Sequence, residues 1–134
     1  MKVIARVFSK DNLPTSPYAR VDLTVIALAL LLITVLHYST WPGFRELHAV
    51  YRYFYFLPIV YAALRFGFWG GLLASLGASL LFAPHIFFKW GTFPEDGLND
   101  LLVIVVFYGV AIITGTGTDR LRESQAELER TAAD

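Results

Sequence analysis

Residues 53–88 constrain this chain most, because they include a single charged residue, Arg65, and no Asn or Gln. A helix rises about 1.5 Å per residue and the hydrocarbon core of a bilayer is about 30 Å thick, so one crossing requires about 20 apolar residues. The stretch is long enough for two crossings. Its middle, residues 65–71, supplies a cation, a Trp and glycines, which suit a turn at the headgroup level. We therefore predict a transmembrane hairpin with a short connection.

The composition indicates a membrane protein of one domain. Of the 134 residues, 56% are hydrophobic and 16% are charged, and the mean hydropathy is +0.55. These values are unusual for a soluble domain. The formal net charge is zero, so no basic surface indicates a nucleic-acid partner. The chain has no cysteine, which excludes disulfides, thiolate metal sites and cysteine nucleophiles.

The hydropathy pattern predicts an all-α integral membrane protein with four transmembrane helices in residues 17–118. Pro17 suits the first helical position, where its missing N–H costs nothing. Pro58 should kink the second span, because proline cannot donate a backbone hydrogen bond inside a helix. The expected spans are residues 17–38, about 49–64, about 70–88 and 101–114, the last extended through 115–118.

The two ends of the chain are more polar than its middle. Residues 1–16 place apolar side chains on one helical face and cations on another, which suits a short helix on an anionic membrane surface. A frayed terminus is the alternative. Residues 119–134 are expected to form a cytoplasmic helical tail. Leu121 and Leu128 lie one heptad apart there and are the expected contacts with a partner, although one heptad is weak evidence for a coiled coil.

The positive-inside rule places both termini in the cytoplasm of a bacterial cell. In this orientation all of the eleven Lys and Arg residues except Arg45, Arg52 and Lys89 lie on the cytoplasmic side. Arg52 and Arg65 flank an apolar run and are expected to extend toward the headgroups. We expect a multi-pass protein of the bacterial cytoplasmic (inner) membrane.

Small residues recur every four positions in the third span and predict close helix packing. In a bilayer, small side chains let two helices approach where no hydrophobic effect drives their association. The residues in these two rows are Gly70, Ala74 and Ala78, and Gly71, Ser75 and Ser79.

The histidines are the candidate ligands of this sequence. His37, His48 and His85 all map to the outer side, together with several carboxylates. Such a cluster could bind Zn, Cu or Ni, or titrate between pH 5 and 8. His85 is the strongest candidate for a ligand-binding or pH-sensing side chain, because polar groups inside apolar runs are costly. The simpler alternative is an amphipathic side chain at the interface, so we expect no metal and no cofactor.

No arrangement of residues indicates catalysis. The Gly115-Thr116-Gly117 segment lacks the lysine and the preceding strand of a phosphate loop. No serine lies in a nucleophile-elbow pattern, and no paired acids occur within the spans. Asp22 and Asp100 lie near span ends, so no acid lies mid-membrane as a proton-coupled transporter requires. We expect a protein that is not an enzyme.

From about residue 45 to residue 122, the chain resembles the four-helix transmembrane module near the N-terminus of many bacterial sensor histidine kinases, including the potassium-sensing kinase type. The matching features are Tyr53-x-Tyr55-x-Leu57-Pro58-Ile59, Ala63-Leu64-Arg65-Phe66-Gly67-x-x-Gly70-Gly71, Leu81-x-x-Pro84-His85, Asp100, and Asp119-Arg120-Leu121. In such kinases the module looks like a dimerising sensor whose last helix runs into the catalytic region.

The resemblance implies a non-catalytic input module of two-component signalling. These 134 residues include neither a phosphoacceptor-histidine helix nor an ATP-binding domain, so we expect a sensor fragment or a stand-alone protein that kept only the membrane module. Its expected partners are the lipid bilayer and a second copy, through the transmembrane helices and the tail. The alternative is a small structural accessory subunit of a larger membrane complex, for example a respiratory or photosynthetic one.

Overall fold

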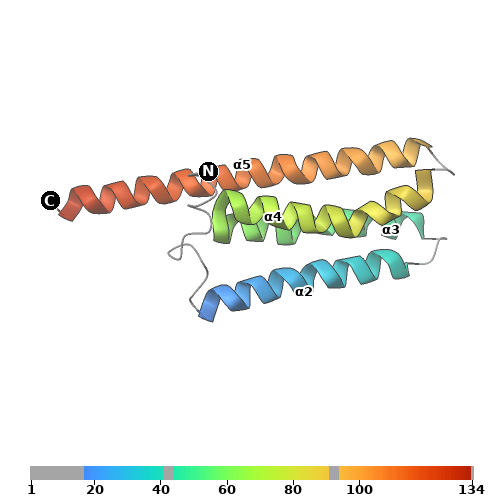
Figure 1. The fold of residues 1–134 in the computed structure, drawn as a ribbon, viewed down its shortest axis with the longest axis horizontal. Coiled ribbons are helices and arrows are strands. Elements are labelled where there is room, and N and C mark those ends of the chain that lie inside the picture. The colour runs from blue at the N-terminus through green and yellow to red at the C-terminus, as the bar shows by residue number, and fades with distance from the viewer. Residues whose placement is uncertain (1–16, 41–43, 91–93, 134) are drawn as a thin grey trace.

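The structure is a computed structural model that describes residues 17–40, 44–90 and 94–133. All regular secondary structure in these ranges is helical, which confirms the all-α prediction. The elements are α2 (Pro17–Ser39), α3 (Arg45–Phe54), α4 (Phe56–Trp90) and α5 (Pro94–Ala133). Figure 1 shows them lying side by side along one axis, with α5 extending beyond the others. The predicted interfacial helix of residues 1–16 lies outside the described residues.

Three helical segments in the described ranges are long and apolar enough to cross a membrane: Tyr18–Ser39, Glu46–Phe87 and Gly97–Ala133. Their outer surfaces carry large apolar side chains that no other part of the chain covers. Leu57, Leu73, Leu80 and Ile113 are examples, and each exposes more than half of its surface. Such a surface is stable in lipid and costly in water, which supports a membrane location.

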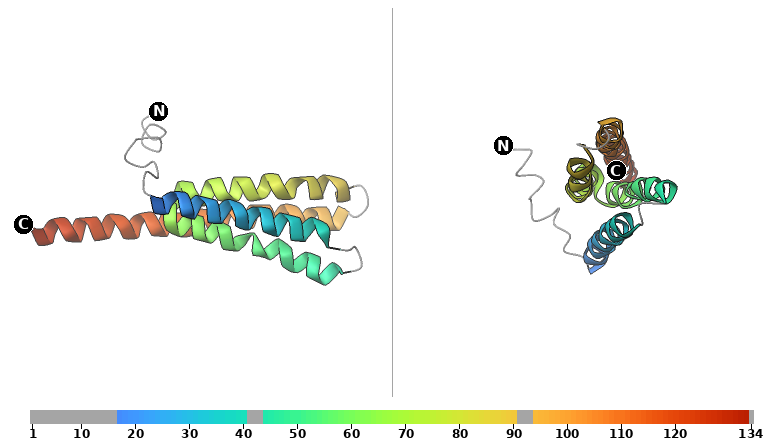
Figure 2. Two further views of the ribbon diagram at one scale, coloured as in Figure 1. Left: turned by 90° about the horizontal axis from the view of Figure 1, so that it is seen from below. Right: turned by 90° about the vertical axis from the view of Figure 1, so that its right-hand side faces the viewer.

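The helix α4 consists of two antiparallel arms that meet at Gly67. Gly67 has φ +75° and ψ −154°, which is outside the helical region and strained for any residue with a Cβ atom. The arms pack on each other directly, because a Cβ atom added at Gly71 would lie 2.9 Å from the Cβ atom of Ala63. The chain therefore reverses within the segment where the sequence predicted a turn (Figure 2).

The helix α3 leads into the first arm of α4 after a break at Tyr55. The break lies one turn before Pro58, where we expected a kink. Here the amide of Ile59 reaches the carbonyl of Tyr55 at 3.5 Å, at the long end of the range for a hydrogen bond. Together, α3 and this arm make one bent rod that runs the length of the bundle (Figure 2).

The helix α5 is longer than the sequence predicted. We expected a loop up to Asp100 and a span from Leu101, but the helix begins at Pro94, a residue that suits a helix start. At its other end α5 continues without interruption through Gly115 and Gly117 into the tail, which confirms the expected extension of the last span into a helical tail. Both glycines remain helical because neighbouring turns supply the hydrogen bonds, and Gly115 is required for close packing, as shown below.

The core lies where the two arms of α4 meet α2 and α5. Its largest fully buried apolar side chains are Tyr55, Ile59, Phe82 and Phe107. The small-residue rows of the second arm lie in the interior of the chain. Gly71 lies against Ala63 and Ala111, and the hydroxyl of Ser75 donates to the carbonyl of Phe107 at 3.1 Å. Ala74, Ala78 and Ser79 are also buried, and Gly70 lies against Ala62 and Phe66.

Candidate functional site

The three histidines of the sequence lie together at one end of the bundle. His37 is in the last turn of α2, His48 is in the first turn of α3, and His85 is near the end of the second arm of α4. Each helix therefore delivers one imidazole to the same place. One potential ligand atom from each ring lies within 4.8 Å of those from the other two.

The rings are close packed and partly shielded from solvent. The rings of His37 and His48 stack with centroids 4.0 Å apart, and the ring of His85 lies 4.7 Å from the first and 4.6 Å from the second. The Nε2 atoms of His48 and His85 are 2.9 Å apart, so one ring donates a hydrogen bond to the other. His37 exposes 1% of its surface, and the side chain of His85 exposes 11%.

An ion pair borders the histidine cluster, by which we mean His37, His48 and His85. The Nη1 atom of Arg52 on α3 lies 2.6 Å from Oδ1 of Asp100 on α5. The other carboxylate oxygen, Oδ2, is 3.9 Å from Nε2 of His85. The side chain of Asp100 exposes only 5% of its surface, so its charge lies in a shielded place. The three imidazoles of the cluster thus have one carboxylate beside them.

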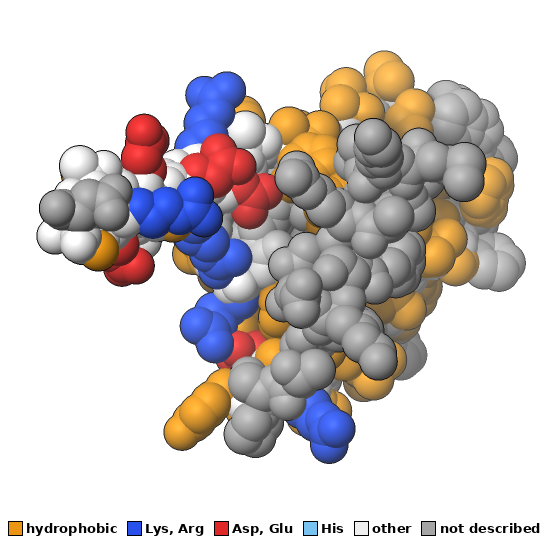
Figure 3. All heavy atoms as spheres, turned by 60° about the vertical axis from the view of Figure 1, so that its left-hand side comes forward, with side chains coloured by type: hydrophobic (Ala, Val, Ile, Leu, Met, Phe, Trp, Pro, Cys, Tyr) orange, Lys and Arg blue, Asp and Glu red, His pale blue; other side chains and the backbone are white. Residues whose placement is uncertain are grey.

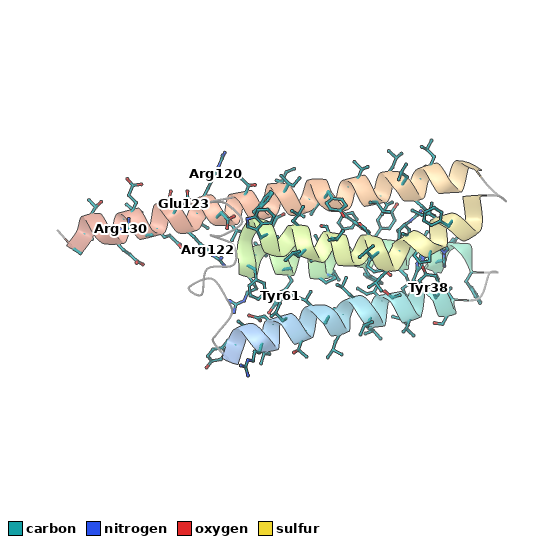
Figure 4. The ribbon with its side chains drawn as sticks, in the orientation of Figure 1. Tyr38, Tyr61, Arg120, Arg122, Glu123 and Arg130 are labelled. Atoms are coloured by element: carbon teal, nitrogen blue, oxygen red, sulfur yellow. The ribbon has the colours of Figure 1, made fainter. Side chains whose placement is uncertain are left out.

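Aromatic side chains form the inner boundary of the cluster. The ring of Phe82 lies 5.4 Å from that of His37 and 5.7 Å from that of His85. Tyr38, labelled in Figure 4, donates from its hydroxyl to the carbonyl of Leu81 at 2.9 Å, which joins the end of α2 to α4. The histidines therefore lie between a packed apolar interior and the end of the bundle.

A second polar cluster lies at the opposite end. Asp22 of α2 accepts hydrogen bonds from the hydroxyl of Tyr61 and from the guanidinium of Arg65, whose Nε atom is 2.7 Å away. Figure 4 shows Tyr61 beside the start of α2. Arg65 therefore binds a carboxylate within the chain, and so does Arg52. We expected both arginines to extend toward the headgroups, and the structure adds that each also has an acidic partner on another helix.

The reversal in α4 is attached to α5 at this second end. The amide of Phe68 donates to Oδ2 of Asp119 at 3.0 Å. Arg122 donates to the carbonyls of Leu64 at 3.1 Å and of Arg65 at 2.6 Å. Two charged side chains of α5 thus satisfy backbone groups that the reversal leaves without helical partners.

Beyond this attachment the tail of α5 is exposed. Leu121 exposes 61% of its surface and Leu128 exposes 69%, and every described residue from 120 to 133 is exposed. Figure 3 shows Arg and Glu side chains along this tail, whereas hydrophobic side chains are visible on the bundle behind it.

The sequence offered a signal for the ion pairs that we did not use. Ionisable side chains inside transmembrane segments usually pair with one another. Asp22 and Asp100 are the acids nearest the spans and Arg52 and Arg65 the nearest cations, so pairing was the expected arrangement. Of the carboxylates placed on the histidine side, Asp100 lies beside the rings and Glu46 is exposed.

Comparison with known proteins identifies one family. A family model described as "Domain of unknown function (DUF4118)" matches residues 23–131. The match covers α2 from Leu23, all of α3 and α4, and α5 through Thr131, which includes most of the tail. It therefore includes all three histidines. No curated protein matches the chain, and no solved structure matches it.

Proposed function

Since the chain belongs to the DUF4118 family, a family described only as a domain of unknown function, we propose from its geometry that it is a membrane-embedded sensor module without catalytic activity. In this proposal the histidine cluster receives the signal and the tail of α5 delivers it. The resemblance to the membrane modules of histidine kinases supports the same assignment, with two-component signalling as its setting.

The observation that carries this proposal is the continuity of α5. One uninterrupted helix includes Asp100 beside the histidine cluster, Asp119 and Arg122 at the reversal of α4, and the exposed tail. A helix is stiff along its axis, so a displacement of Asp100 would reach the tail as a shift or rotation of the whole rod. A module that only anchored a partner would not require a polar cluster in contact with this rod.

The topology that we propose has four crossings, with both ends of the chain in the cytoplasm of a bacterial cell. Asp100 and Asp119 are separated by about 28 Å along α5 at about 1.5 Å per residue, close to the roughly 30 Å of a hydrocarbon core. The two polar clusters would then lie at the two faces of the membrane. The cations Arg120, Arg122 and Arg130 on the tail favour the cytoplasm for that end.

The alternative is an accessory subunit of a larger membrane complex. The exposed tail favours this alternative as much as a sensor, because an isolated helix of this length is marginal in water and gains stability by packing on a partner. A sensor module would pair its tail with the tail of a second copy. An accessory subunit would pair it with a different protein.

The chain has no cysteine, so a spin label attached to one introduced cysteine reports a single position. This allows the sensor module and the accessory subunit to be distinguished by whether two tails lie together. The chain with Glu127→Cys is spin-labelled, reconstituted in lipid nanodiscs with two copies per disc, and the distance between the two tails is measured. We expect a defined distance between tails that changes when Asp100→Asn alters the end beside the histidines. The matched control is Asp22→Asn, which breaks the ion pair at the other end.

A defined distance that both variants leave unchanged would overturn transmission along α5. No dipolar coupling between tails, together with co-purification of a different protein in fixed ratio from native membranes, would overturn the sensor in favour of the accessory subunit. The double variant Leu121→Asp with Leu128→Asp checks the contact surface, because it should abolish whichever of the two associations the tail makes.

A further inference from the structure

We propose that His37, His48 and His85 bind one divalent transition-metal ion of the Zn²⁺ class. Asp100 is either the fourth ligand or a carboxylate directly beside the bound ion. The proposal of metal binding is supported by the positions of these side chains alone. The further statement that the metal is the signal rests on the proposed sensor function.

The first argument is convergence. The sequence has three histidines, separated by many residues and carried by α2, α3 and α4, and the fold brings all three within one small volume. Their ligand atoms lie within 4.8 Å of one another, and the closest pair is 2.9 Å apart. In a tetrahedral zinc site with Zn–N bonds of about 2.0–2.1 Å, ligand nitrogens are about 3.3 Å apart. To reach that spacing, the more distant ligand atoms would move closer together and the Nε2 atoms of His48 and His85 slightly apart.

The second argument concerns the ligand type. Imidazole nitrogen suits Zn, Cu, Ni and Co, whereas hard cations such as Mg²⁺ prefer oxygen. The rings of His48 and His85 share one hydrogen bond, in which one Nε2 donates and the other accepts. A metal ion accepts lone pairs from all three rings at once. On binding, the ring that donates through Nε2 adopts the tautomer with its proton on Nδ1, so its Nε2 lone pair becomes available without any net release of protons.

The third argument concerns charge and surroundings. Oδ2 of Asp100 is 3.9 Å from Nε2 of His85, within easy reach of an ion held by that nitrogen. Zinc accepts both His nitrogen and Asp oxygen and is usually four-coordinate, so a carboxylate beside three imidazoles would complete its ligand set. The packed rings of Phe82 and Tyr55 on the inner side limit access of water, and this strengthens the attraction between the cation and the carboxylate.

The position of Asp100 also links the ion to α5. Its carboxylate now binds Arg52 through Oδ1 at 2.6 Å. A divalent ion at the histidines would compete with Arg52 for this carboxylate and would draw α5 toward α2 and the second arm of α4. The tail belongs to the same helix, so metal binding at Asp100 and movement of the tail would both act through α5.

The test uses the full chain of 134 residues, purified through a tag without histidine and reconstituted in nanodiscs. Zn²⁺ retained after gel filtration is measured by elemental analysis, and Co²⁺ is used as a probe because its visible absorption reports tetrahedral coordination. We expect about one ion per chain and a tetrahedral Co²⁺ spectrum. His37→Ala, His48→Ala and His85→Ala should each weaken binding by at least about 100-fold, and Asp100→Asn by about 10- to 100-fold.

Two matched controls keep the result interpretable. Asp22→Asn removes a paired carboxylate at the other end of the bundle and should leave Zn²⁺ affinity unchanged. Tyr38→Phe removes a hydroxyl next to the cluster without removing an imidazole, and should also leave it unchanged. Every variant is compared with the native chain by thermal unfolding without metal, and His→Gln replaces any His→Ala variant that fails to fold.

The outcomes separate the metal site from the sensor proposal. If the native chain retains no Zn²⁺, or if the histidine variants retain as much as the native chain, the metal site is overturned, and the tail-distance experiment still tests transmission. If the ion binds as expected but the distance between labelled tails does not change on adding Zn²⁺, the site stands and its assignment as the sensory input is overturned.

Discussion

Asp119 of α5 accepts a hydrogen bond at 3.0 Å from the amide of Phe68, the first residue after the reversal at Gly67. The carboxylate thus caps the second arm of α4 from a different helix. The N-terminus of a helix carries a partial positive charge and free N–H groups, both of which a carboxylate satisfies. Because the cap belongs to α5, this contact fixes the depth of α5 relative to the hairpin.

Replacing Asp119 by Ala should destabilise the bundle by about 1 kcal/mol, the usual cost of losing a capping side chain. The control is Glu123→Ala, because Glu123 lies on the exposed part of the tail (Figure 4) and should have little effect. Thermal unfolding in detergent measures both. Equal midpoints for the two variants would contradict a capping contact.

Gly67→Ala should destabilise the chain by more than the Asp119 variant. The residue has φ +75°, a conformation that costs roughly 1–2 kcal/mol for a residue with a Cβ atom, and that atom would also collide with the carboxylate of Asp119. Gly77→Ala, in the second arm of α4, is the matched control. Its new Cβ atom would meet only Leu30 at 3.8 Å, so the better helix propensity of Ala should leave stability equal or higher.

Gly115 and Gly117 provide a sharper comparison, because they lie two residues apart on one helix. A Cβ atom at Gly115 would lie 2.5 Å from Cα and 2.8 Å from the amide nitrogen of Phe68, and backbone atoms cannot move aside cheaply. Gly115→Ala should therefore cost about 1–3 kcal/mol. A Cβ atom at Gly117 has no neighbour within 4 Å, so Gly117→Ala should raise stability by up to about 1 kcal/mol. A fall of similar size in both unfolding midpoints would show that α5 does not approach the turn this closely.

The parts of the fold that depend on hydropathy and on single residues were predictable from the sequence. The apolar stretch and its central glycines indicated the hairpin, and the character change after Thr118 indicated the tail. The start of α5 was not predictable in the same way. Its first turns contain Gly97, so local propensity there favours a loop. Packing against the second arm of α4 outweighs that preference.

In the candidate site too, some features were predictable from the sequence and others were not. The three histidines were recognised as possible ligands, but nothing in their spacing indicates that their rings meet, because that depends on how three helices pack. Arg52 and Arg65 were interpreted one at a time, as side chains near a membrane surface. Pairing them with Asp100 and Asp22 requires the order of helices around the bundle, which the hydropathy pattern does not contain.

The ion pair of Arg52 and Asp100 should behave as a coupled unit. Arg52→Met leaves a shielded carboxylate without its cation, a change that typically costs about 3–5 kcal/mol. The double variant Arg52→Met with Asp100→Asn removes both charges and should recover a large part of that loss. Arg120→Met, on the exposed tail, is the control and should change stability little. Additive losses in the double variant would contradict a direct pair.

The membrane orientation can be checked with two glutamates at opposite ends of the bundle. Glu46 is exposed in the first turn of α3, on the side of the histidine cluster, and Glu127 is exposed on the tail. Four crossings with a cytoplasmic tail place these two side chains on opposite sides of the membrane. A thiol introduced by Glu46→Cys should therefore react with a membrane-impermeant maleimide in intact bacterial spheroplasts, whereas one introduced by Glu127→Cys should react only after permeabilisation.

Because the native chain has no cysteine, each variant reports a single position. The same test applied at Gly43, Thr92 and Lys10 extends it to segments outside the described residues: the first two thiols should react from outside and the third should not. Labelling of Glu127→Cys but not Glu46→Cys in intact cells would invert the orientation and place the histidines in the cytoplasm. Labelling of both would mean that the helices do not cross four times, because an even number of crossings between α3 and the tail would put both thiols on one side.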